Sequence, residues 1–61
     1  MKITKGTKIE SNKMVMVVTG ETESAFIGYY EYKGKPVGQC SMLKEALNNP
    51  HFMERIMIIN E

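Results

Sequence analysis

The sequence predicts a small α+β fold, in which an antiparallel β-sheet, made of a four-stranded meander and a C-terminal strand, carries one short helix packed on one face. Residues 2–10 and 25–32 alternate with a period of two, residues 14–18 form an apolar run, and Gly, Asn, Ser and Pro divide this stretch into short pieces. The apolar spacing then becomes helical, and a short β-branched run follows. With 61 residues, we expect a single domain, residues 1–61.

The first two strands are expected at residues 2–10 and 14–18. In the first, Ile3, Thr7 and Ile9 fall on one side, as in a half-buried strand, and polar residues fall on the other. The second is a continuous apolar run, which is typical of a strand that is covered on both faces. We therefore expect residues 14–18 at the centre of the sheet.

The third strand is expected at residues 25–32. The alternation places Phe26, Tyr30 and Tyr32 on one face of this strand. Tyr29 then lies on the opposite face. The segment is rich in aromatic residues, which favour strands.

Two glycines and a proline mark the irregular positions of the meander. Gly28, inside the third strand, indicates a bulge or a close approach of two backbones. Gly34 can take the positive φ that a turn over residues 33–36 requires. Pro36 has no N–H to donate, so we expect it to begin an edge strand that continues through residues 37–40.

The helix is expected at residues 42–47, where apolar residues have helical spacing and Ser41 precedes them as N-cap. Pro50 ends this helix and starts a second short turn through residues 51–54. Residues 56–59 fit either an extension of that turn or a last strand, and their brief β-branched run favours the strand. The core is expected to contain Val15, Val17, Phe26, Leu43, Leu47 and Ile58.

The composition argues against several classes of function. The net charge of +1 does not suit a protein whose main role is to neutralise phosphates. No apolar run approaches the ~20 residues that span a bilayer, and no signal peptide is recognisable, so we expect no membrane partner and a cytoplasmic protein. The glycines are dispersed and form no phosphate-binding loop.

Candidate catalytic and metal-binding residues are few. Cys40 is the only cysteine, His51 is the only histidine, and the chain has no aspartate. The two residues could pair as nucleophile and base across the helix. However, a lone cysteine after a strand is more often a small buried hydrophobe, and a lone histidine after proline is more often a surface residue. We therefore predict no enzyme, no metal and no cofactor, and we expect both side chains to be chemically idle.

The leading functional prediction is a small protein-binding regulator or inhibitor. The chain is too short for elaborate chemistry, and it has more apolar residues than one helix can cover. Its methionines suit surfaces that adapt to partners, although we expect most of them in the core. A composition rich in Lys, Asn, Ile and Met but poor in Arg is typical of AT-rich coding sequences, which suggests an accessory protein of a phage or mobile element that acts on a host protein.

The predicted binding surface combines tyrosines and lysines of the third strand and its turn. Exposed tyrosines provide a large, rigid contact area, and burial of all three would require a hydrogen-bond partner for each hydroxyl. The same residues could instead stack nucleic-acid bases, so a nucleic-acid-binding module is the alternative. The predicted site residues are Tyr29, Tyr30, Tyr32, Lys33 and Lys35.

A homodimer is also predicted. A domain of about this size buries only ~60% of the surface that its unfolded chain exposes. With one cysteine the chain cannot form an internal disulfide, so association with a second copy is a plausible source of stability. We expect the contact through a sheet edge or through the apolar face of residues 56–59.

Overall fold

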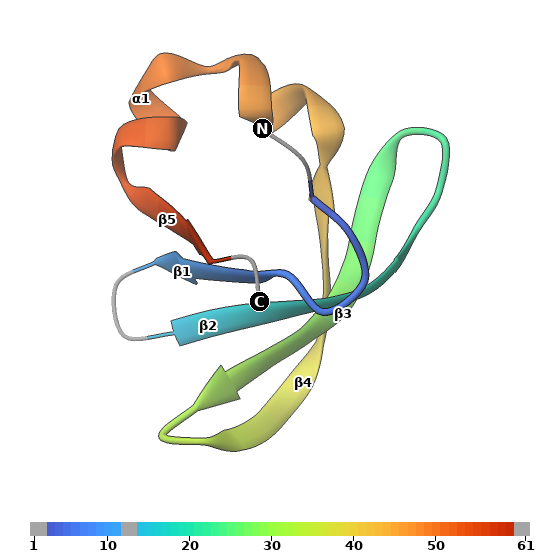
Figure 1. Ribbon diagram of the computed structural model, residues 1–61, viewed down its shortest axis with the longest axis vertical. Helices are drawn as coiled ribbons and strands as arrows, with labels where there is room; N and C mark the ends of the chain where they lie inside the picture. Colours follow the sequence, from blue (N-terminus) through green and yellow to red (C-terminus); the bar gives the residue numbers. More distant parts are fainter. Residues whose placement is uncertain (1–2, 12–13, 60–61) are drawn as a thin grey trace.

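The structure is a computed structural model that describes residues 3–11 and 14–59 (Figure 1). These residues form one five-stranded antiparallel sheet with the strand order β4-β3-β2-β1-β5. In chain order, the elements are β1 (Lys8–Ser11), β2 (Met14–Glu21), β3 (Ala25–Tyr32), β4 (Lys35–Leu43), the 3-10 helix η1 (Lys44–Asn48), the α-helix α1 (Pro50–Glu54) and β5 (Ile56–Ile59). The predicted α+β class, with its meander, short helix and C-terminal strand, is confirmed.

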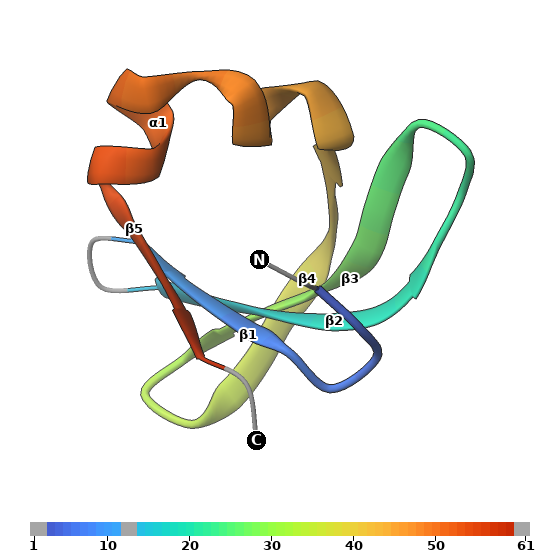
Figure 2. The same ribbon diagram turned by 45° about the horizontal axis from the view of Figure 1, so that its top comes forward.

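The sheet is strongly curved, and the segment formed by η1 and α1 stands over its concave face (Figure 1, Figure 2). Two shifts in strand register accompany this curvature. One lies in β2 between Val18 and Gly20, and the other lies between Tyr30 and Glu31, where β3 pairs with β4. Irregularities of this kind bend the strand and increase its local twist.

Two glycines occupy positions where the backbone geometry requires a residue without a side chain. A Cβ at Gly28 would lie 1.9 Å from the carbonyl oxygen of Val17, so the close backbone approach predicted there is confirmed. Gly34, with φ of 80°, follows Lys33, with φ of 54°. Two consecutive positive φ values are those of a type I′ turn, whose twist matches that of the strands β3 and β4 that it joins.

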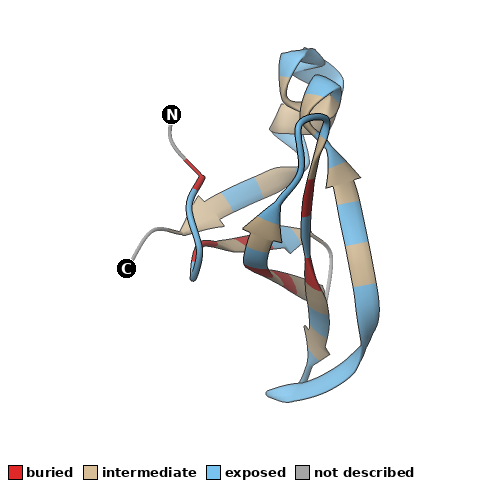
Figure 3. Ribbon diagram, turned by 90° about the vertical axis from the view of Figure 1, so that its right-hand side faces the viewer, coloured by how far each residue is buried: buried red, intermediate tan, exposed pale blue. Residues whose placement is uncertain are grey.

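The core lies between the concave face of the sheet and the elements that cover it. Its buried residues are Ile3, Thr7, Ile9, Met16, Val18 and Phe26. Phe26 was expected here, and the half-buried Leu47 and Ile58 pack against the cluster. Figure 3 shows that the buried residues gather on the central strands and the N-terminal segment, whereas none of the nine residues of β4 is buried.

Three expectations about the core were wrong. Val15 and Val17 are only half-buried, and Leu43 is 60% exposed. The buried residues of β2 are Met16 and Val18, which alternate with the two valines. The physical reason is that the helical segment covers only one face of the sheet, so a continuous apolar run in β2 is buried at every second position.

The first strand begins later than predicted because residues 3–7 form a turn. The backbone N–H of Thr4 donates to Thr7 Oγ1 over 3.0 Å, and the N–H of Thr7 donates to the carbonyl of Thr4 over 3.0 Å. Gly6 has a φ of 96°, which suits glycine. The paired strand therefore starts only at Lys8.

The predicted helix at residues 42–47 was wrong in its start and its type. Strand β4 runs on to Leu43, which pairs with Ala25, so Ser41 lies in a strand and caps no helix. The 3-10 helix η1 follows, without a side-chain cap. The expected turn after it is present as α1, where the side chain of Asn49 accepts hydrogen bonds from the backbone N–H groups of His51 and Phe52 over 2.9 and 3.3 Å.

Candidate functional site

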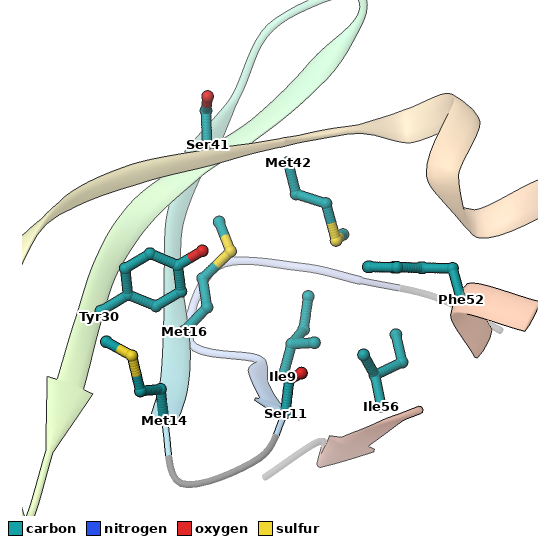
Figure 4. A pocket seen from close by; sticks show the side chains of 9 residues that line it. All are labelled: Ile9, Ser11, Met14, Met16, Tyr30, Ser41, Met42, Phe52 and Ile56. Carbon is teal, nitrogen blue, oxygen red and sulfur yellow. The ribbon is translucent and has the colours of Figure 1, made fainter. Parts of the chain in front are cut away.

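The concave side of the sheet contains an apolar pocket of about 430 Å³ (Figure 4). The sheet forms its floor, and α1 with the start of β5 closes one side. Its polar lining groups are few, namely those of Ser11, Ser41 and Tyr30. The apolar residues that line it are Ile9, Met14, Met16, Met42, Phe52 and Ile56.

Strand register explains why these side chains meet. Ile9 pairs with Met16 across β1 and β2, and Met16 pairs with Tyr30 across β2 and β3. Directly paired residues of an antiparallel sheet point to the same face, so these three side chains form one row across the floor. Phe52 lies on α1 and faces this floor from the opposite side, near Met42 (Figure 4).

The pocket contains little that could orient a polar ligand. Figure 4 shows Ser41 pointing away from the other lining side chains, which leaves the hydroxyls of Tyr30 and Ser11. Within residues 3–11 and 14–59, no buried side-chain nitrogen or oxygen lacks a hydrogen-bond partner. The same residues contain no cluster of His, Cys, Asp and Glu that could hold a metal ion. The pocket is therefore suited to an apolar group.

Three of the lining residues are methionines, which make the pocket adaptable. Met14 and Met42 are half-buried, and Met16 is buried at the floor. A thioether side chain has three rotatable bonds and a polarizable sulfur, so it adjusts to differently shaped apolar groups at low cost. The sequence shows the methionines but not which of them share a face with Phe52 and Ile56.

The five predicted site residues are divided between two faces and a turn. Tyr30, 38% exposed, lines the pocket, and Tyr32, 40% exposed, lies two residues further along the same strand. Lys35 pairs with Tyr32, and the Lys33 ammonium lies 5.5 Å from the centre of the Tyr32 ring. Tyr29 alternates with them and is half-buried on the opposite, convex face.

Cys40 and His51 occur on different elements. Cys40 is half-buried in β4, where burial raises the pKa of its thiol, and a protonated thiol is a poor nucleophile. His51 is exposed on α1. The chemical idleness of both residues stays a prediction.

No protein-family model matches this chain, and no curated protein or solved structure shows significant similarity to it. Among the residues that the structure describes, no helix has the length and apolar character needed to cross a membrane.

Proposed function

We propose that this protein is a small, non-enzymatic protein-binding regulator or inhibitor that accepts an apolar side chain of a partner protein in the methionine-lined pocket. The observation that carries this proposal is the pocket itself, an open apolar hollow of about 430 Å³ on a chain of 61 residues. Soluble monomers seldom leave such apolar surface open without a use for it. The regulated partner would be a host protein if the chain is an accessory protein of a phage or mobile element.

A protein side chain suits this pocket better than a small polar metabolite does. Small-molecule sites combine an apolar lining with a few convergent polar groups that fix the orientation of the ligand. Among the described residues, the hydroxyls of Tyr30 and Ser11 are the side-chain groups available for that role. An apolar anchor residue needs no such groups, because the rest of the partner, held at the rim, sets its orientation.

The exposed tyrosines provide that rim. Tyr30 borders the pocket, and Tyr32 continues the same face toward the turn. Tyrosine rings bring large contact areas at low conformational cost, and they concentrate around interface hot spots. Lys33 and Lys35 lie beside Tyr32, so a partner with acidic residues next to its apolar anchor would gain complementary charge.

The alternative, a nucleic-acid-binding module, receives less support from this geometry. Base stacking needs an open aromatic face, whereas the ammonium of Lys33 lies over one face of the Tyr32 ring. Tyr29 lies on the opposite face of the sheet and cannot extend the same stacking platform. The net charge of +1 also provides little attraction for phosphates.

Affinity capture from an extract of the native host tests the proposal. The bait proteins are the wild type, the pocket variant Met14→Glu and the control Met57→Glu, which introduces the same charge at a convex-face residue that is 61% exposed. We expect the wild type and the Met57→Glu control to retain the same partner protein, and the Met14→Glu variant to lose it.

Two results would contradict the proposal. Equal retention by a folded Met14→Glu variant would place the binding surface outside the pocket. Retention of nucleic acid that disappears with added salt, without an enriched protein, would favour the alternative. Circular dichroism of each bait shows whether it is folded.

A further inference from the structure

Strand β4 forms an open edge of the sheet. Within residues 3–11 and 14–59, it pairs with β3 on one side and ends the strand order β4-β3-β2-β1-β5. Its nine residues are all exposed or half-buried, and they include Val37, which is 55% exposed, and Leu43. An edge of this length presents a row of backbone donors and acceptors that can add a further strand.

The hydrogen-bond pattern shows which backbone groups face outward. The N–H of Lys44 donates to the carbonyl of Ser24 over 2.9 Å, and the β3–β4 register continues from that bond toward the turn. Hydrogen-bonded and non-hydrogen-bonded pairs alternate in an antiparallel ladder. The backbone N–H and C=O groups of Gln39 and Ser41 therefore point away from β3, and so does the N–H of Leu43.

Protection of this edge is confined to one end. Lys35 and Pro36 lie at the start of β4, and both residue types discourage the addition of another strand. From Gly38 to Leu43 the strand contains neither a charged residue nor a proline. The unprotected part is also the part in which Gln39 and Ser41 face outward.

The sequence around β4 is complementary to itself about Cys40. Val37 and Leu43, the two exposed large apolar residues of the strand, lie three residues before and three residues after it. Lys35 lies five residues before Cys40, and Glu45 lies five residues after it. Glu45 lines a hollow together with Leu43, Glu23 and Lys44, and the Lys44 ammonium pairs with Glu21, so carboxylates outnumber ammonium groups at this end of β4, whereas the opposite end carries Lys33 and Lys35.

We propose that two copies of this chain pair antiparallel along β4, with the two-fold axis at Cys40. Gln39 then lies opposite the partner subunit's Ser41, and the outward backbone groups of these residues form four hydrogen bonds over the two symmetric pairs. Val37 meets the partner subunit's Leu43, and the basic end of each β4 approaches the acidic end of the other. A parallel arrangement would bring ends of like charge together.

The dimer goes beyond the proposed function and does not depend on it. Two five-stranded sheets become one continuous sheet of ten strands. Because the two-fold axis is perpendicular to the sheet, both concave faces lie on the same side, and the two pockets open in the same general direction. A partner with two apolar anchors could then be held by both copies at once.

The opposite edge, β5, is a weaker candidate. It has four residues, against nine in β4. The N–H of Val18 donates to the carbonyl of Thr7 over 2.9 Å, and hydrogen-bonded and non-hydrogen-bonded pairs alternate from this bond along β1 and β2. Every second residue of β1 therefore bonds to β5, and in β5 only Ile56 and Ile58 direct their backbone groups away from β1. Both of these side chains pack against the core instead of forming a free apolar face.

Sedimentation velocity over roughly 10 to 500 micromolar protein tests the proposal. One paired strand buries less surface than the ~800 Å² per partner of a standard interface. The dimer should therefore be weak and should dissociate on dilution within this range. The edge variant Gln39→Lys with Ser41→Lys places like charges opposite each other in both symmetric pairs. We expect its dimer dissociation constant to rise about tenfold or more. A control variant, His51→Lys, adds charge on exposed α1 and should dimerise like the wild type.

A second variant tests the position of the two-fold axis. Gln39→Lys combined with Ser41→Glu places opposite charges face to face only when the axis lies at Cys40, so we expect it to dimerise at least as well as the wild type. With the axis at Gln39 or Ser41, identical charges would meet across it. Three results would overturn the proposal. The wild type could stay monomeric throughout the concentration range, or the variant with two lysines could dimerise like the wild type. The Lys/Glu variant could also dimerise no more tightly than the variant with two lysines. Side chains 39 and 41 are exposed, and circular dichroism confirms that each variant is folded.

Discussion

The two faces of the sheet are built by the same strands but have different roles. On the concave face, Ile9, Met16 and Val18 are buried beneath the helical segment. On the convex face, Val15 and Val17 are only half-buried and do not belong to the core cluster. The comparison shows that apolar content alone does not locate the core. Burial depends on which face a second layer covers.

The largest effect is expected at Gly28, where the backbone of β2 approaches too closely for a side chain. Gly28→Ala should reduce the free energy of unfolding by about 3 kcal/mol or more, because the new Cβ would overlap the backbone oxygen of Val17, which cannot move without disturbing the sheet. Gly38→Ala is the matched control, since a Cβ there meets no atom within 4 Å. Urea denaturation measures both variants, and equal stability of the two would contradict the close approach.

A smaller loss of stability is expected for a methionine on the concave face, and almost none for a methionine on the convex face. Met16→Ala removes a side chain that is only 4% exposed on the concave face, and should cost about 2 kcal/mol of the free energy of unfolding. Met57→Ala removes the same side chain from the convex face, and should change stability by less than about 0.5 kcal/mol. Thermal and urea denaturation provide the comparison. A large loss in the Met57→Ala protein would show that the convex face is covered in solution.

The smallest effect concerns Cys40. Burial raises the pKa of its thiol, so the thiolate fraction at pH 7–8 is lower than in the unfolded chain. Alkylation by iodoacetamide should therefore be slower for the folded protein than in urea, and it should accelerate as the pH rises. Since the folded pKa is the higher one, this group's contribution to stability is present below the unfolded pKa and is lost as the pH rises through the folded pKa. Faster alkylation of the folded protein would contradict the predicted idleness of Cys40.

The candidate site was only partly predictable. Tyr30 and Tyr32 were expected at a binding surface; in the structure Tyr30 lines the pocket, and Tyr32 lies two residues further along the same strand. Tyr29 could be assigned to the opposite face from the period-two pattern alone. The contribution of Phe52 and Ile56 could not be predicted, because it depends on where α1 and β5 return to the sheet.

The sequence by itself determined the tight turn after β3 and the start of α1, because these depend on the conformational preferences of adjacent residues. Gly34 accounts for the tight turn between β3 and β4, and Asn49 followed by Pro50 accounts for the start of α1. Tertiary structure decided which alternate residues became core, and it extended β4 through Ser41 where the spacing suggested a helix. The physical reason is that apolar periodicity defines two faces but does not say which will be covered, and pairing with β3 outweighs the weak helical preference of a few residues.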